Sequence, residues 1–263
     1  MLRGPAGGRN RDVPVARSAP GRPGRAAFHR RRRPRRQPLS SARPPAAVRP
    51  ETATRPREPR SLPDYTGRMH SPSRVIPANE YRRLRWANQA GWTREIHADP
   101  GPGDWTWRVS IAELDGAAPF SPLPGVEREL VLLRGEGLRL RFADGAAVDL
   151  GSPHGRLRFD GGRVLAGEPE GRCEVFNLMW RRDTAGVQLW HRPLTGAMLV
   201  FTEPGSTWIV HLLGGHARIG ADAALPALAA GDTALLRAQD RRARYVIDGG
   251  GEVLLARIDA AAC

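Results

Sequence analysis

The part of the chain from residue 69 to residue 263 is predicted to be all-β, a sandwich or barrel built from many short strands. Short apolar runs in this part alternate with polar residues at the period of two that a half-buried strand requires. Glycine, proline and aspartate interrupt these runs at regular intervals, which marks turns between strands. No segment of ordinary helical length carries the apolar stripe of an amphipathic helix.

The clearest strand covers residues 105–112, in which successive side chains alternate between two faces. Further strands are expected after it, with turns at Asp144-Gly145, Gly214-Gly215, Gly231-Asp232 and Asp248-Gly250. The expected strands lie at 129–133, 138–142, 146–150, 174–180, 187–191, 197–201, 207–213, 216–219, 233–237, 243–247 and 252–258.

A weak internal repeat links two stretches about 80 residues apart. Leu133–Asp144 and Leu213–Asp222 both read as strand, glycine turn, strand and Ala-Asp turn. The repeat favours two copies of one small barrel in residues 69–263, although any two hairpins share such features.

The first 68 residues differ sharply in composition from the rest of the chain. They hold 18 Arg, four acidic residues and 12 of the 24 Pro, whereas residues 69–263 hold 23 Arg and 23 acidic residues. The formal charge of +14 therefore belongs entirely to the leader, and the remainder carries no global field that would steer a polyanion. The leader cannot bury enough apolar surface to order itself, so disorder is expected there.

Three interpretations of the leader remain open. It is a basic tail for nucleic acid or anionic surfaces, an Arg-rich targeting peptide, or upstream sequence translated from a misplaced start, with the natural start near Met69. The chain lacks Lys altogether, which indicates genomic base bias and weakens any argument from Arg content. A nucleic-acid partner is expected only if the leader is genuine.

Cysteine content and hydropathy indicate a cytoplasmic protein. The two cysteines, Cys173 and Cys263, form neither a disulfide framework nor a zinc motif, and Cys173 is expected to be structural. No stretch is long and apolar enough to span a membrane, and no secretory signal is evident.

Five ordered motifs resemble the HutD/Ves family. Trp86–Ile96 resembles its opening Trp-x-Asn-Gly-Gly-Gly-x-Thr-x-Glu-Ile string, and Trp107–Ala112 its Trp-Arg-x-Ser-x-Ala strand. Pro119–Arg128 is similar to its Phe-Ser-x-Phe-Pro-Gly-x-x-Arg loop, while Phe159–Gly161 and Phe176–Arg182 are similar to its Phe-x-Gly and Asn-x-Met-x-Arg elements. The resemblance covers roughly residues 75–263.

The resemblance implies a bicupin, in which one chain forms two double-stranded β-helix barrels. It also implies a link to histidine utilisation or a stress response in bacteria, with a small acidic metabolite such as urocanate or formylglutamate as the proposed ligand. One departure is that Gln89 and Ala90 replace two glycines after Asn88. If those glycines adopt positive φ, this loop must be rearranged here.

No metal site is expected from the sequence. Cupin enzymes commonly use a His-x-His pair, and none of the seven histidines forms one. His211 and His216 flank Gly214-Gly215 and could approach across a hairpin, but an ordinary structural role is favoured for both. Ligands could still converge from distant strands.

The candidate ligand-binding residues lie on polar faces of predicted strands. Arg108 shares a face with Ser110, and inside a barrel its cation would need a partner. Glu95 is the structural candidate, and a ligand carboxylate is the alternative. Phe120 is expected to plug the barrel mouth. The predicted ligand-binding set is Asn88, Thr93, Glu95, Arg108, Ser110, Arg128, Asn177, Met179 and Arg181.

These features favour non-catalytic binding of a small anionic metabolite, with a regulatory or stress-related role and no cofactor. The first alternative is a metal-dependent isomerase or dioxygenase with atypical ligands, and the second is a regulatory protein whose leader contacts nucleic acid. A monomer or homodimer is expected, with no membrane partner.

Overall fold

A computed structural model describes residues 72–86, 89–220 and 225–261 of the chain. The chain divides into two units, Met1–Arg60 and Ser61–Cys263, and every described residue belongs to the second. The predicted leader, residues 1–68, lies outside the described residues. The all-β prediction is confirmed, since the described elements are strands apart from the short 3₁₀ helix η1 (Ala78–Glu80). None of the described helical segments is long and apolar enough to cross a membrane.

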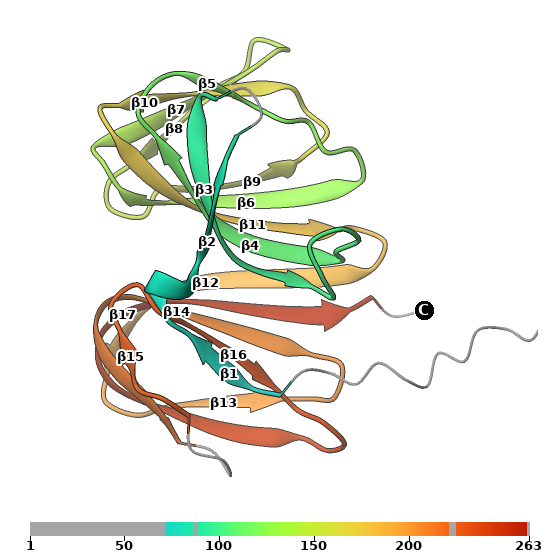
Figure 1. Cartoon of the computed structure of the whole chain (residues 1–263), viewed down its shortest axis with the longest axis vertical. Helices are drawn as coiled ribbons and strands as arrows, with labels where there is room; N and C mark the ends of the chain where they lie inside the picture. Colours follow the sequence, from blue (N-terminus) through green and yellow to red (C-terminus); the bar gives the residue numbers. More distant parts are fainter. Residues whose placement is uncertain (1–71, 87–88, 221–224, 262–263) are drawn as a thin grey trace, which may run out of the picture. The chain divides into compact units, whose positions relative to one another are not determined.

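The N-terminal barrel consists of two antiparallel sheets (Figure 1). A six-stranded sheet has the order β2-β3-β4-β11-β6-β9, and a four-stranded sheet has the order β5-β10-β7-β8. The strands are β2 (Arg82–Arg85), β3 (Gly91–Asp99), β4 (Trp107–Leu114), β5 (Ala118–Phe120), β6 (Val126–Arg134), β7 (Gly137–Phe142), β8 (Ala147–Gly151), β9 (Arg156–Asp160), β10 (Leu165–Glu170) and β11 (Cys173–Arg181).

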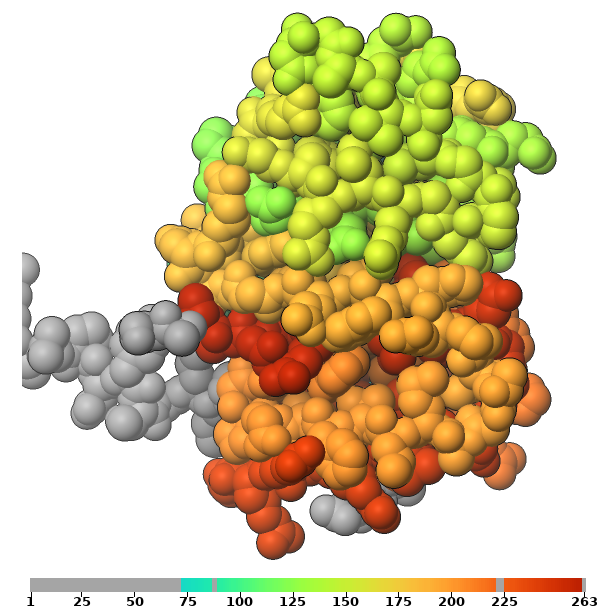
Figure 2. All heavy atoms as spheres, turned by 180° about the vertical axis from the view of Figure 1, so that it is seen from behind, coloured from blue at the N-terminus to red at the C-terminus, as the bar shows by residue number. Residues whose placement is uncertain are grey.

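The C-terminal barrel is one seven-stranded sheet with the path β1-β16-β14-β17-β12, on which β13 pairs with β17 and β15 with β14. The first strand of the described chain, β1, pairs with β16 and therefore belongs to the C-terminal barrel. The strands that follow it in the sequence, from β2 onward, belong to the N-terminal barrel. Seen from behind, the two barrels are lobes in direct contact (Figure 2). The strands are β1 (Arg74–Ile76), β12 (Ala185–Thr195), β13 (Met198–Thr202), β14 (Thr207–Gly220), β15 (Leu228–Ala229), β16 (Thr233–Arg237) and β17 (Ala243–Ala260).

The buried core of the described chain consists of three apolar layers. One layer fills the N-terminal barrel, a second fills the C-terminal barrel, and the third lies between them. Strand β4 contributes to two layers because its side chains alternate: Trp107, Val109 and Ile111 enter the layer between the barrels, while Ala112 faces the N-terminal barrel interior. The predicted alternation therefore holds, although the strand begins at Trp107 rather than at Trp105.

Two predicted turns are wrong, because the glycines at Gly214-Gly215 and Asp248-Gly250 lie inside continuous strands. These two segments pair with each other, since Gly215 is opposite Gly251 and β14 carries a bulge between Leu212 and Gly214. A Cβ atom on Gly215 would collide with the backbone of Gly250. The glycines therefore permit close backbone approach where a long strand pair bends around the barrel, and they do not end the strands.

The internal repeat is visible in the backbone of the two barrels. Glycines with positive φ recur 80 residues apart, at Gly125 and Gly205, Gly135 and Gly215, and Gly171 and Gly251. Gly135 separates β6 from β7, whereas Gly215 lies within β14, so the same bend breaks the strand in one barrel and not in the other.

Candidate functional site

A cavity of about 430 Å³ opens into the N-terminal barrel. Its walls come from the inward faces of β3, β4, β6 and β11, from the end of β2, and from the segment around β5. The volume falls in the range of small-molecule sites. The lining residues are Leu84, Arg85, Trp86, Thr93, Arg108, Ser110, Ala112, Pro119, Phe120, Ser121, Leu123, Arg128, Asn177 and Met179.

Strand register places the predicted polar residues in two rows across the cavity wall. Asn177 on β11 is opposite Ser110 on β4, and two residues further along Met179 is opposite Arg108. On the other edge of β11, Met179 is opposite Arg128 of β6. Two arginines thus flank one methionine on the same face of the sheet, which concentrates positive charge in the cavity.

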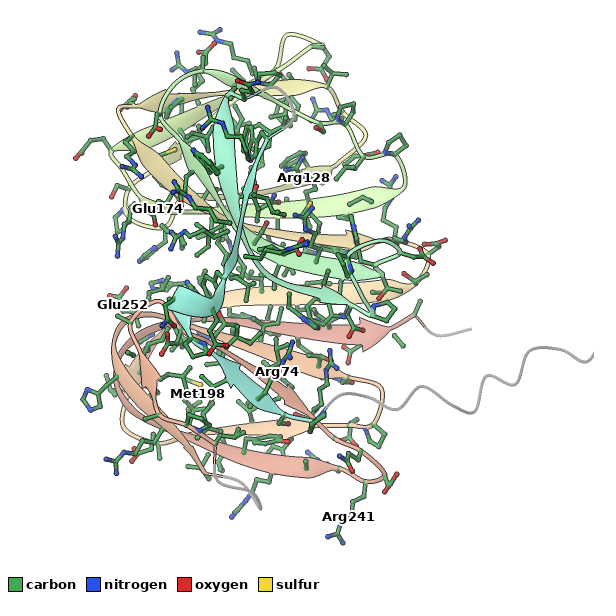
Figure 3. All side chains as sticks on the ribbon, viewed as in Figure 1. Arg74, Arg128, Glu174, Met198, Arg241 and Glu252 are labelled. Atoms are coloured by element: carbon green, nitrogen blue, oxygen red, sulfur yellow. The ribbon has the colours of Figure 1, made fainter. Side chains whose placement is uncertain are left out.

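Arg128 is a buried cation, with 4% of its surface exposed (Figure 3). Its Nη1 donates a long 3.4 Å hydrogen bond to the carbonyl of Ser121, and its guanidinium lies over the rings of Phe120 and Phe159. Within the described residues it has no acidic partner, and its Nε has no hydrogen-bond acceptor. Burial, and secondarily the charge of Arg108, lower the pKa of Arg128 to about 10, so it remains a cation at neutral pH.

Arg108 has the structural partner that the sequence indicated. Its Nε lies 2.7 Å from Glu95 Oε2, although the N–H bond is not aligned on that oxygen. Glu95 also pairs with Arg82 on the neighbouring strand, at 2.6 Å. Glu95 itself does not line the cavity. The pair leaves the second arginine, Arg128, as the cation with unsatisfied charge.

Two further polar atoms in the wall are buried without a partner in the described part of the chain. These are the hydroxyl of Ser110 and the side-chain carbonyl of Asn177. Nearly all buried polar groups in proteins have a hydrogen-bond partner, supplied by the protein, water or a ligand. Thr93 is already engaged, because its hydroxyl accepts a 2.8 Å hydrogen bond from the indole of Trp86, but its own proton can still be donated.

Apolar side chains complete the lining of the cavity. Trp86 and Phe120 meet edge to face with their centroids 5.5 Å apart, and Leu84 and Leu123 also line the cavity. Phe120 is buried and contributes directly to the lining. Sequence reasoning did not select Trp86 or the leucines as site residues, although Trp86 opens the first family motif.

Besides Glu95, two predicted residues are not placed in the cavity. Asn88 lies outside the described residues. Arg181 is exposed at the end of β11, where it donates to the carbonyl of Trp105 and pairs with Asp104. Next to Asn88, Gln89 adopts φ of 58°, so the loop keeps a left-handed residue at one of the positions where glycine was expected.

The sequence model of the HutD family matches residues 78–255. The chain belongs to the HutD family. The match covers both barrels, so this HutD-family protein is a cupin with two double-stranded β-helix barrels.

Individual relatives agree with this assignment. The chain is 38% identical over 106 residues to Protein Ves of Cronobacter sakazakii, covering 40% of this chain and 58% of that protein. It is 33% identical over 115 residues to an uncharacterised 21.2 kDa protein in the hutC 3′ region of Pseudomonas putida, covering 40% of this chain and 57% of that protein. The chain therefore spans somewhat more than half the length of these curated relatives.

The solved structure of HutD from Pseudomonas fluorescens SBW25 superposes with a TM-score of 0.63 at 22% identity. The superposition covers 72% of this chain and all of that one. At this level of identity the likeness concerns the fold.

The cavity of this HutD-family protein offers no metal-ligand set, because its lining among the described residues contains no imidazole, thiol or carboxylate. His211 and His216 do not form a pair: His211 is buried and bonded to Thr233 at 2.9 Å, while His216 is exposed. Cys173 is buried, and burial raises the pKa of its thiol to about 11. The cavity is thus suited to hold an anion rather than to activate one through a metal.

Proposed function

We propose that the N-terminal barrel binds a small organic carboxylate connected with histidine utilisation, as a sensor or buffer rather than as a catalyst. The observation that carries the proposal is Arg128, a buried cation with no acidic partner among the described residues. An isolated buried charge is costly, and a guanidinium is the side chain best matched to a carboxylate. A ligand carboxylate would supply the missing anion.

The remaining lining suggests how such a ligand lies. Ser110 and Asn177 offer unsatisfied polar atoms next to the two arginines, and they can orient a polar group. Trp86 and Phe120 offer an apolar aromatic surface in the same cavity. This combination favours a planar, conjugated carboxylate such as urocanate over the flexible formylglutamate.

The link to histidine utilisation rests on the family and on the relative in the hutC 3′ region. A metabolite of that route is therefore the first ligand class to test. The cavity has no acid–base pair or metal-ligand set in the described lining, which supports binding over catalysis.

A thermal-shift screen of the purified full chain tests the proposal, with urocanate, formylglutamate, histidine and glutamate at millimolar concentration. Ligand well above its dissociation constant raises the unfolding temperature by mass action. We expect urocanate to give the largest rise and its methyl ester, which keeps the ring but loses the charge, to give none. The absence of a rise with all four compounds would contradict the proposal.

A further inference from the structure

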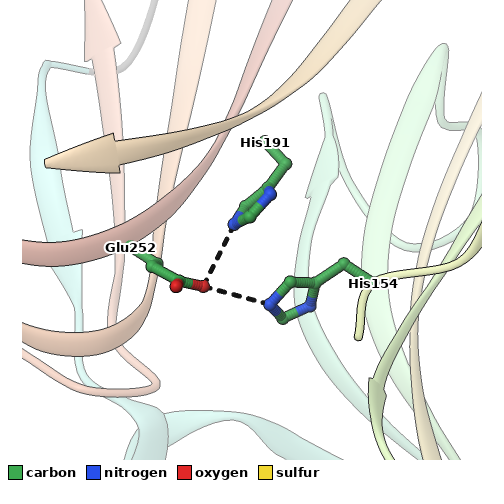
Figure 4. Close-up of side chains that lie close together, drawn as sticks. All are labelled: His154, His191 and Glu252. Atoms are coloured by element: carbon green, nitrogen blue, oxygen red, sulfur yellow. Dashed lines mark hydrogen bonds and ion pairs between the residues drawn. The ribbon is translucent and has the colours of Figure 1, made fainter. Parts of the chain in front are cut away.

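Three metal-ligating side chains converge outside the cavity, where the two barrels meet. They are His154, His191 and Glu252, whose ligand atoms all lie within 4.8 Å of one another. Figure 4 shows both imidazoles directed at one carboxylate oxygen, with His154 Nε2 and His191 Nε2 each 3.1 Å from Glu252 Oε2. Glu252 lies at the level of the junction, far from Arg128 in the view of Figure 3.

The fold brings these residues together from three places in the sequence. His191 on β12 is opposite Leu254 on β17, so Glu252 is its diagonal neighbour on the same face of the sheet. His154 comes from the connection between β8 and β9 of the other barrel and holds φ of 58°. Arg156 fixes the same connection against β12, through a 3.0 Å hydrogen bond to the carbonyl of Leu189.

The environment of His154 matches that of a metal ligand. Its Nδ1 faces the carbonyl of Leu132 at 3.4 Å, so this nitrogen carries the proton. The other ring nitrogen, Nε2, is the atom directed at Glu252, at 3.1 Å, and the ring lies 4.5 Å from that of His191.

We propose that His154, His191 and Glu252 bind one Zn²⁺-class divalent ion across the junction of the two barrels. Two imidazoles and one carboxylate form a known zinc-ligand set that leaves a fourth position open. Ligand bonds of about 2.0–2.2 Å place neighbouring donor atoms about 3.4 Å apart, close to the two distances of 3.1 Å. A zinc-bound histidine usually donates its second ring N–H to a carbonyl or carboxylate, and Nδ1 of His154 faces the carbonyl of Leu132 in this way.

The position suggests what the ion does. The side chains of Glu252 and His191 are 51% and 38% exposed, so the open coordination position faces solvent, while His154 is nearly buried. Because one ligand comes from the N-terminal barrel and two from the other, the ion would join the barrels and stabilise their contact.

Metal titration of the full chain, purified without an affinity tag and freed of metal with a chelator, tests this site. The wild type and His216→Ala, which removes an exposed histidine outside the cluster, should each bind one Zn²⁺. His191→Ala and Glu252→Gln should bind it at least about 100-fold more weakly, since loss of supporting groups alone costs 10–100-fold. Added Zn²⁺ should raise the unfolding temperature of the first two proteins and not of the others.

Cobalt substitution provides a second readout, because Co²⁺ bound by this ligand set has visible absorption that the two ligand variants should lack. Thermal unfolding in chelator shows whether each variant is folded. The proposal is overturned if the metal-free wild type takes up no Zn²⁺ or Co²⁺. It is equally overturned if His191→Ala and Glu252→Gln bind as tightly as the wild type, because the ion would then be held elsewhere.

Discussion

Among the described residues, each barrel contains one buried arginine, and the two arginines have opposite surroundings. Arg237 on β16 is 5% exposed and pairs with Asp99 of the other barrel at 2.7 Å, with Thr207 accepting from its Nε. Arg128 on β6 is 4% exposed and has no acidic partner in the described chain. The first therefore joins the barrels as a structural ion pair, whereas the second lies in a cavity where a ligand can supply its anion.

The interiors of the barrels differ in the same way. The C-terminal barrel is filled by an apolar cluster, and a cavity of about 450 Å³ lies at its β16–β17 connection, bordered by arginines and Tyr245. The N-terminal barrel keeps a polar cavity inside, next to its own apolar cluster. One repeated architecture thus gives one barrel with its cavity at a strand connection and one with its cavity on the inward faces of its strands.

The largest expected effect comes from removing the anion of the paired arginine. Burial alone would raise the pKa of Asp99, but the hydrogen bond from His97 and the charge of Arg237 lower it to about 2. Asp99→Asn leaves Arg237 buried and unpaired, which should lower the free energy of unfolding by about 4 kcal/mol. Urea unfolding at pH 7 measures the loss. Asp104→Asn, at the exposed partner of Arg181, should change it by less than about 0.5 kcal/mol. Equal losses of unfolding free energy in the two variants would show that the ion pair of Arg237 with Asp99 does not stabilise the protein.

A third buried basic side chain, His211, is held neutral between the barrels. Burial, and then the charge of Arg94, lower the pKa of His211 to about 4 from its ordinary 6.5. The imidazole of His211 binds a proton more tightly in the unfolded chain than in the folded one. Lowering the pH from 6.5 towards 4 therefore favours the unfolded state and lowers the free energy of unfolding, whereas above pH 6.5 this residue causes no loss. The loss should be about 3 kcal/mol. Urea unfolding between pH 7.5 and 4 measures it, and His211→Gln should remove that part of the pH dependence. An unchanged profile in the variant would assign it to other groups.

Replacing each buried arginine by methionine should have opposite effects on stability. Arg128→Met removes an uncompensated buried charge and keeps much of the side-chain volume, so the free energy of unfolding without ligand should rise by about 1–2 kcal/mol. Arg237→Met breaks an ion pair and should lower it. Chemical denaturation of the two variants at pH 7 provides the comparison. Destabilisation by both would mean that Arg128 is structural as well.

The smallest effect is expected at the loop beside the cavity. Gln89 holds a left-handed backbone conformation, so Gln89→Gly should stabilise the protein by about 1 kcal/mol. Gln188→Gly, at an exposed position within β12, should destabilise it by a similar amount. Thermal unfolding of both variants shows whether the unfolding temperature rises in the first and falls in the second. If both variants or neither were stabilised, the left-handed conformation of Gln89 would not be the cause.

The sequence predicts the parts of this molecule that depend on local pattern. Alternation along β4 and β11 places Arg108, Ser110, Asn177 and Met179 on one face, and the structure has them on the cavity wall. Glycine runs mislead, because glycine serves both turns and close strand crossings, and only tertiary pairing distinguishes the two at Gly215.

Contacts between residues far apart in the chain could not be predicted from the sequence. Nothing local indicates that Asp99 meets Arg237, or that His154 meets His191 and Glu252, because these pairs form only when two barrels pack together. Short strands such as β1 and β15 also escape prediction, since two or three residues carry no measurable period. Trp86 was missed as a lining residue because aromatic residues usually belong to the core.

Calorimetric titration with urocanate tests the central claim, that Arg128 binds the anion of a ligand, most directly. The wild type and Arg181→Gln, whose arginine lies outside the cavity, should bind with the same affinity. Arg128→Met should bind about 10- to 100-fold more weakly, because it loses a charged hydrogen bond. Equal binding by Arg128→Met and the wild type would contradict the account.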